Sequence, residues 1–163
     1  MSNSGNETTP AGRAVGEAGV LAALDGAEMG IFVLDSNFRV EWLNSTAATY
    51  FGLEQEAAIG RDKRALIESS IKGIFEQPDR FAETVIDTYD DNTYIEEFEC
   101  HVLAGENREE RWLRHQSRPI ETGDLAGGRV EQYTDITERK ARERELERQN
   151  DRLEKFASVV SHD

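Results

Sequence analysis

The first 28 residues change from a polar stretch to a short amphipathic one. Residues 1–16 carry few large apolar side chains and contain Gly and Pro, a composition that predicts a disordered tail. Over residues 17–28, Val20, Leu21 and Leu24 fall on one side of a helix, which predicts a short amphipathic helix. Its apolar side needs a partner, either the domain that follows or a second copy of the chain.

The next apolar runs predict a β-hairpin and then a two-turn helix. Residues 30–34 and 38–43 are rich in apolar side chains and flank a turn-forming trio at 35–37. Asn44 is a good N-cap for the following helix, and Gly52 is a good terminator because it takes positive φ without strain.

Helical spacing continues to about residue 92, and a period of two then replaces it. A helix is predicted from Pro78, with apolar residues at helical spacing to its end. Residues 94–102, 111–120 and 129–136 alternate and are separated by Gly-containing turns, which predicts three antiparallel strands. With the hairpin they predict an α+β fold over residues 29–136, a five-stranded antiparallel sheet with helices on one face.

Residues 137–163 predict one long charged helix. Leu146, Leu153 and Val160 recur every seven residues, and Gln149 and Phe156 occupy the positions between them. This spacing predicts a parallel two-stranded coiled coil. A single solvated helix is the alternative.

Composition narrows the functions that the chain can have. It has 163 residues, 33 acidic and 19 basic, and a net charge of −14, so nucleic acid is a poor electrostatic partner. Hydrophobic residues make up 37% of the chain, enough for one core. Most basic residues are Arg, and this acidic, Arg-rich composition resembles that of salt-accumulating halophiles; an ordinary acidic surface is the alternative.

Several kinds of site and segment are not expected. Cys100 is the one cysteine, which excludes an intrachain disulfide and a cysteine-rich metal site. The sequence has no apolar run of transmembrane length and no signal-peptide pattern, so we expect a cytoplasmic protein without membrane insertion in this segment. Residues 20–135 contain no nucleophile motif, metal cluster or phosphate-binding loop, so we do not expect an enzyme. The chain stops within a helix, and we expect it to be part of a longer protein.

The order of these elements, together with particular residues, resembles a PAS domain, the small sensory module of signalling proteins. The resemblance covers about residues 20–140, and its most specific part is the DITERK ending after the last strand. The residues that carry it are 30–35 (GIFVLD), 40–44 (VEWLN), Ala47, 60–62 (GRD), Arg111, Trp112, Gly128 and 135–140 (DITERK).

Residues 153–163 (LEKFASVVSHD) resemble the opening of the dimerisation and phosphoacceptor helix of sensor histidine kinases. This resemblance implies that His162 is the phosphoacceptor. On the seven-residue register His162 lies off the apolar seam beside Asp163, which is then the candidate base for its proton. A solvated histidine without a function is the alternative.

The start of the long helix is a candidate signal hinge. Asp135 precedes Glu138 by three residues, as in a capping box, so Asp135 is expected to cap the helix. The PAS resemblance implies that Asp135 and Thr137 also tie the helix to the sheet. Arg111 and Arg114 are both candidate partners, and the sequence does not choose between them.

The PAS resemblance also implies a small-molecule or cofactor site between the sheet and the helices. Simple core packing is the alternative for its aromatic members, and Cys100 is expected to be a packed apolar residue. Residues 53–92 lack the His that would bind haem in a PAS domain, and no Asn-Cys-Arg-Phe-type motif occurs, so neither haem nor a flavin photoadduct is expected. The expected ligand is instead a flat, mostly apolar organic molecule. The candidate lining residues are Phe32, Leu34, Trp42, Tyr50, Phe75, Phe98, Cys100, Leu113, His115, Ser117 and Gln132.

These features predict a cytoplasmic PAS sensor module of a two-component, histidine-kinase-type protein, which relays its ligand state through the C-terminal helix to His162. Its expected partners are a second copy, held through the N-terminal helix and the coiled coil, and, in the full protein, an ATP-binding kinase domain and a response regulator. The alternatives are a ligand-free PAS dimerisation module and a sensory transducer without kinase output.

Overall fold

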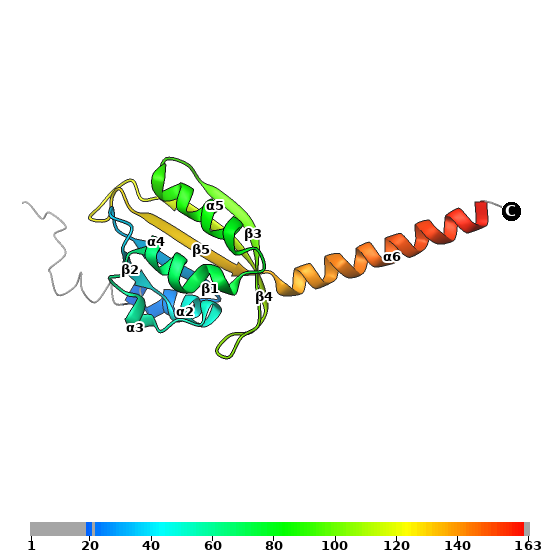
Figure 1. Ribbon diagram of the computed structural model, residues 1–163, viewed down its shortest axis with the longest axis horizontal. Helices are drawn as coiled ribbons and strands as arrows, with labels where there is room; N and C mark the ends of the chain where they lie inside the picture. Colours follow the sequence, from blue (N-terminus) through cyan, green and yellow to red (C-terminus); the bar gives the residue numbers. More distant parts are fainter. Residues whose placement is uncertain (1–18, 21, 162–163) are drawn as a thin grey trace, which may run out of the picture.

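The computed structural model describes residues 19–20 and 22–161, and Figure 1 shows an antiparallel sheet with helices packed on one face. Residues 19–20 and 22–25 are helical. The elements that follow are β1 (Met29–Leu34), β2 (Val40–Leu43), α2 (Ser45–Phe51), α3 (Gln55–Ala58), α4 (Lys63–Leu66), the π-helical turn η1 (Ile67–Ile71), the 3₁₀ turn η2 (Lys72–Ile74), α5 (Pro78–Asp90), β3 (Glu96–Val102), β4 (Arg111–Pro119), β5 (Arg129–Asp135) and α6 (Thr137–Ser161).

The strand order is β2-β1-β5-β4-β3, and every neighbouring pair is antiparallel. The last strand in the sequence, β5, lies at the centre of the sheet, so both halves of the chain meet along it. Directly after β5 the chain enters α6, which extends away from the sheet as a rod (Figure 1). The predicted five-stranded antiparallel sheet with helices on one face, followed by a long C-terminal helix, is confirmed.

Asn44 fixes the start of α2 and its place against the sheet. Its side-chain oxygen accepts hydrogen bonds from the backbone N–H of Ala47, as the predicted N-cap, and of Ile31 in β1, both at 2.9 Å. Its amide group donates to the carbonyl oxygens of Met29 and Leu24. Because Asn44 is fully buried and uses all these groups, one side chain joins the helix, the sheet and the segment before β1.

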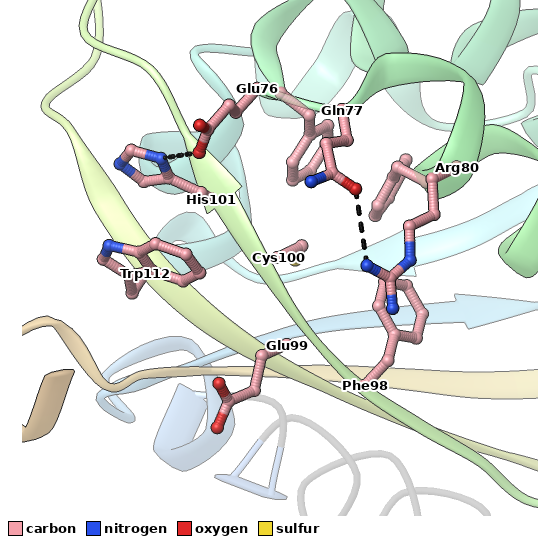
Figure 2. A pocket seen from close by; sticks show the side chains of 10 residues that line it. Glu76, Gln77, Arg80, Phe98, Glu99, Cys100, His101 and Trp112 are labelled. Atoms are coloured by element: carbon pink, nitrogen blue, oxygen red, sulfur yellow. Dashed lines mark hydrogen bonds and ion pairs between the residues drawn. The ribbon is translucent and has the colours of Figure 1, made fainter. Parts of the chain in front are cut away.

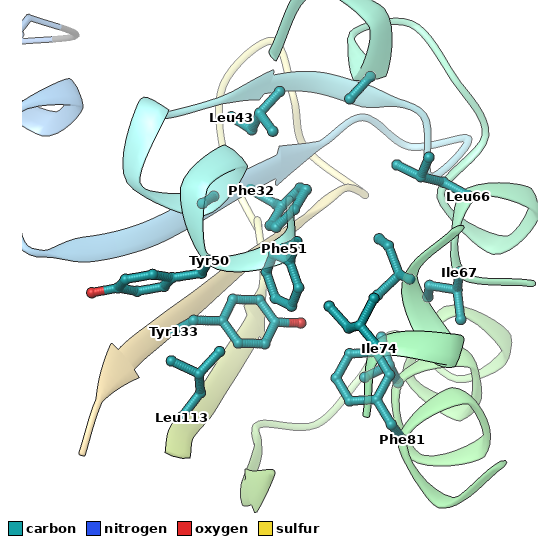
Figure 3. Packing of buried hydrophobic residues seen from close by; sticks show 14 of the residues in the cluster. Phe32, Leu43, Tyr50, Phe51, Leu66, Ile67, Ile74, Phe81, Leu113 and Tyr133 are labelled. Carbon is teal, nitrogen blue, oxygen red and sulfur yellow. The ribbon is translucent and has the colours of Figure 1, made fainter. Parts of the chain in front are cut away.

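The core lies between the inner face of the sheet and the helices, as Figure 3 shows. The Phe51 ring of α2 packs 5.5 Å from Phe32 of β1 and 4.8 Å from Tyr133 of β5, measured between centroids. Phe75 stacks on Phe81 at 3.8 Å. Each ring buried in this way stabilises the fold by about 1.5–3 kcal/mol, and together these side chains fill the interior.

Two strands begin later than the sequence pattern predicts. β2 begins at Val40 because Phe38 adopts a left-handed backbone with φ 59°, which interrupts the extended chain. β3 begins at Glu96 rather than at residue 94. The predicted tail over residues 1–16, and the predicted roles of Leu21, His162 and Asp163, concern positions that lie outside the described residues.

Candidate functional site

Most of the predicted lining residues lie on the inner side of the sheet, among packed side chains. The exceptions are Trp42 and Gln132, which the register pairs with Val33 and Ile31 on the opposite face, away from the helices. Their expected inward position is therefore wrong. Those that face the helix side are Phe32, Leu34, Tyr50, Phe75, Phe98, Cys100, Leu113, His115 and Ser117.

The interior holds a buried ion pair that sequence analysis did not predict. Lys63, at the start of α4, places its ammonium 2.9 Å from one carboxylate oxygen of Glu131 in β5, and both side chains are at most 1% exposed. The Tyr89 hydroxyl donates to the other carboxylate oxygen at 2.6 Å. Burial alone would raise the pKa of Glu131, but the Lys63 charge, His115 and the hydrogen bonds outweigh it, so the pKa lies below its usual range.

A second group of buried polar side chains continues from this ion pair. The Arg129 guanidinium donates two hydrogen bonds to the Ser117 hydroxyl, at 3.0 and 2.8 Å, so the proton of that hydroxyl is free to point to Nε2 of His115 at 3.0 Å. Burial lowers the pKa of His115 to about 4, so the ring is neutral at pH 7. Because Nε2 accepts from Ser117, the ring proton is placed on Nδ1. Within the described chain, His115 Nδ1 and the Tyr133 hydroxyl have no hydrogen-bond partner.

The sequence contained one signal for this cluster. Glu131 shares the period-two face of Tyr133, so the alternation that places Tyr133 inside also places Glu131 inside. No comparable signal marks Lys63, because it stands among charged residues in a short helix.

A groove of about 420 Å³ opens beside the edge strand β3, where the segment between η2 and α5 and the first turn of α5 face it (Figure 2). It includes three of the predicted ligand residues, Phe75, Phe98 and Cys100. Burial raises the pKa of the Cys100 thiol, which donates to the Leu113 carbonyl, so this cysteine is a packing residue. The groove is lined by Phe75, Glu76, Gln77, Arg80, Phe81, Phe98, Glu99, Cys100, His101 and Trp112.

One wall of the groove is a stack of two rings. The His101 imidazole lies parallel to the Trp112 indole, with 4.4 Å between centroids and 6° between planes. Carboxylate oxygens of Glu76 and Glu110 lie 2.6 and 2.8 Å from the two ring nitrogens of His101. Through His101, the stack therefore joins the segment before α5, which carries Glu76, and the end of the β3–β4 turn, which carries Glu110, to Trp112 in β4.

Asp135 and Thr137 connect β5 to α6 as the sequence suggested. The Asp135 carboxylate accepts from the backbone N–H of Thr137 at 2.9 Å and from its hydroxyl at 2.5 Å, and the Trp112 backbone N–H donates to that hydroxyl at 3.0 Å. Arg111 is the arginine that reaches Asp135, with 3.5 Å between Nε and the carboxylate. Arg114 takes no part, because its pairing with Thr134 places it on the other face of the sheet.

Beyond this cap, Glu99 and Trp112 hold the first two turns of α6, and we call these contacts the α6 seat. Lys140 and Arg139 place their charged groups 2.5 and 2.7 Å from the Glu99 carboxylate. The hydrogen bond from Lys140 is the main reason that the pKa of Glu99 lies below its usual value. Lys140 and Arg144 also lie over the Trp112 ring, at 4.8 and 5.0 Å from its centroid.

The far half of α6 presents its apolar residues to solvent. Leu146, Leu153, Phe156, Val159 and Val160 are each between 55 and 71% exposed. They include the four apolar positions of the predicted seam, Leu146, Leu153, Phe156 and Val160, which form a stripe along the rod. No helix within the described ranges is both long and apolar enough to cross a membrane, and no cluster of metal-binding side chains occurs there.

Comparisons with known proteins agree with this geometry. A family model described as the PAS fold matches residues 24–141, and no curated protein matches the chain. The PAS domain of an HTR-like protein from Haloarcula marismortui has a TM-score of 0.53 at 15% identity, covering 76% of this chain and 99% of that one. A PAS domain from Colwellia psychrerythraea has a TM-score of 0.52 at 20% identity, covering 75% of this chain and 98% of that one. A domain of a sensory box sensor histidine kinase/response regulator from Geobacter sulfurreducens has a TM-score of 0.51 at 14% identity, covering 80% of this chain and 100% of that one. These identities are evidence for the fold alone.

Proposed function

Over residues 24–141 the chain belongs to the PAS family, and from this premise we propose that it is the cytoplasmic sensory module of a histidine-kinase-type signalling protein. In this proposal the state of the domain reaches His162 through α6. The chain itself is a regulatory segment and not an enzyme. The kinase reaction would use an ATP-binding domain elsewhere in the full protein, and a response regulator would receive the phosphoryl group.

The observation that carries the proposal is the double attachment of α6 to the sheet. The cap formed by Asp135 and Thr137 joins α6 to the central strand, and the α6 seat joins it to β3 and β4. A change in the sheet therefore moves both attachments of one stiff helix. The ion pairs of the seat are partly exposed and each is weak, so a second arrangement of the helix that breaks them would cost little free energy.

A second copy of the chain is the partner that best explains the apolar stripe on α6. Two parallel helices would cover the seam at Leu146, Leu153 and Val160, which otherwise faces water. The N-terminal amphipathic helix would extend the same interface. His162 would lie off this seam, where a kinase domain can reach it, with Asp163 as its base.

The SVVSHD sequence at residues 158–163 supports a kinase output. A ligand-free PAS dimerisation module is the second candidate. The packed interior favours it, because side chains and the Lys63–Glu131 ion pair occupy the space between sheet and helices.

Phosphorylation of the full-length protein tests the proposal. Labelled phosphate from ATP is expected on His162, and His162→Gln is expected to abolish it. Asp135→Ala, which removes the cap but leaves the phosphoacceptor, is expected to change the rate. Exposed Glu56→Gln in α3, far from α6 in the chain, is the matched control and is expected to leave the rate unchanged. Labelling that survives His162→Gln would refute the phosphoacceptor assignment.

A further inference from the structure

We propose that the groove beside β3 binds a small organic carboxylate with a flat apolar body, and that its occupant acts on the α6 seat. This inference rests on the sensory function proposed above and names the place and chemical class of the signal. The proposed ligand site is therefore at the edge of the sheet and not in the packed interior, where the sequence analysis expected it.

The groove has the size and lining of a small-molecule site. Its volume of about 420 Å³ falls within the range of about 300–1,000 Å³ that is usual for such sites. Half-buried Phe98 and the stacked rings of His101 and Trp112 supply aromatic surface, whereas Phe75 and Phe81 in the lining are at most 3% exposed. Flat apolar groups pack well against such rings, so the lining selects the body of the ligand.

The charges that line the groove select its head group. The carboxylate of Glu76 is paired with His101, and that of Glu99 with Lys140 and Arg139. Arg80 has no carboxylate partner among the described residues, and its guanidinium only donates to the side-chain oxygen of Gln77 at 3.3 Å. An uncommitted guanidinium favours an anion locally, and a carboxylate matches its geometry.

The edge of β3 offers a second donor at the same place. The Glu76 N–H donates to the His101 carbonyl and the Leu103 N–H donates to the Ile74 carbonyl, so the odd-numbered residues of β3 turn their backbone groups away from β4. By the same alternation the N–H of Glu99 points out from the sheet edge beside the groove. A carboxylate can accept from this N–H and from Arg80.

A ligand in this position touches the residues that hold α6. Glu99 and Trp112 line the groove and also form the α6 seat, through Lys140, Arg139 and Arg144. An added carboxylate beside Glu99 competes for the same positive charges and loosens that contact. The groove is therefore coupled to α6 by direct contact, without a path through the core.

The test is a titration of the whole chain, labelled with ¹⁵N, with phenylacetate and with its neutral counterpart phenylacetamide. We expect saturable shifts of the Glu99 amide and the Arg80 side chain, and at least about tenfold weaker binding of the amide. Arg80→Gln is expected to weaken phenylacetate binding at least about tenfold and to leave phenylacetamide unchanged. Arg61→Gln, an exposed arginine outside the groove, is the matched control and is expected to change neither.

Binding must also reach α6. Phenylacetate is expected to speed amide hydrogen exchange over residues 138–144. The absence of saturable shifts, equal affinity for acid and amide, shifts confined to His115 and Tyr133, or binding without faster exchange would each overturn the inference. If the groove fails these tests while Asp135→Ala still changes phosphorylation of His162, the proposed relay stands and only the groove is lost.

Discussion

The buried Lys63–Glu131 ion pair makes the sharpest prediction about stability. Lys63→Met keeps most of the side-chain volume but leaves the Glu131 carboxylate fully buried with the Tyr89 hydroxyl as its remaining donor. Removing one partner of a buried pair costs about 3–5 kcal/mol, a large part of the about 5–15 kcal/mol that stabilises a typical domain. Replacing both partners, as in Lys63→Met with Glu131→Leu, is expected to recover most of this loss, because no uncompensated charge stays inside.

Urea denaturation followed by circular dichroism measures the effect. With a slope of about 2 kcal/mol per molar urea, the midpoint of Lys63→Met falls by about 2 M. The neighbouring Arg64 provides the matched control, because it forms a 2.6 Å pair with Asp90 that is exposed on both sides, and Arg64→Gln is expected to cost at most about 1 kcal/mol. Equal losses for Lys63→Met and Arg64→Gln, or a double variant no more stable than Lys63→Met, would show that the stability does not depend on the pairing of Lys63 with Glu131.

Three further predictions concern other parts of the fold. The pKa of His115 is about 4 in the folded chain and 6.5 ordinarily, so the unfolded chain takes up a proton at this position first as the pH falls. At about 1.4 kcal/mol per pH unit, the free energy of unfolding is expected to drop by about 3 kcal/mol between pH 7.5 and pH 4 because of this group. In His115→Phe this part of the pH dependence is expected to vanish. Gly128→Ala brings a Cβ against the Leu34 carbonyl oxygen and is expected to lower the free energy of unfolding by about 1–3 kcal/mol, whereas Gly73→Ala, with open space around it, serves as control; equal midpoints in urea would contradict this. Leu153→Asp places a charge on the α6 seam and is expected to dissociate the proposed dimer in analytical ultracentrifugation, whereas Asp151→Asn, off the seam, is expected to leave it intact.

The sheet could be predicted from the sequence because its signals are local. Phe98 and Cys100 alternate with Glu97 and Glu99, and the register places the first pair on the helix side and the second pair on the other. Turn residues between the strands then leave antiparallel neighbours as the simplest arrangement. The same local alternation predicted the last strand over residues 129–136, and β5 ends one residue earlier, at Asp135.

The candidate site was less predictable because it depends on contacts between distant residues. Glu131 lies 68 residues from Lys63, and no local pattern links the two. The choice between Arg111 and Arg114 needed the register of β4 against β5, which puts Arg111 on the side of Asp135. Trp42 and Gln132 were assigned to the wrong face because an apolar or amide side chain on a strand does not reveal which side the helices cover.

In the proposed function, the α6 seat controls how two copies of α6 meet. Spin labels on Asp151→Cys, at an exposed position off the seam, measure the distance between the two helices, and buried Cys100 is expected to stay unlabelled. We predict one narrow distance in the otherwise unchanged chain and a shifted or broader distribution when Glu99→Gln removes the charge that holds Lys140 and Arg139. The same distribution in both proteins, or no coupling between labels in either, would contradict it.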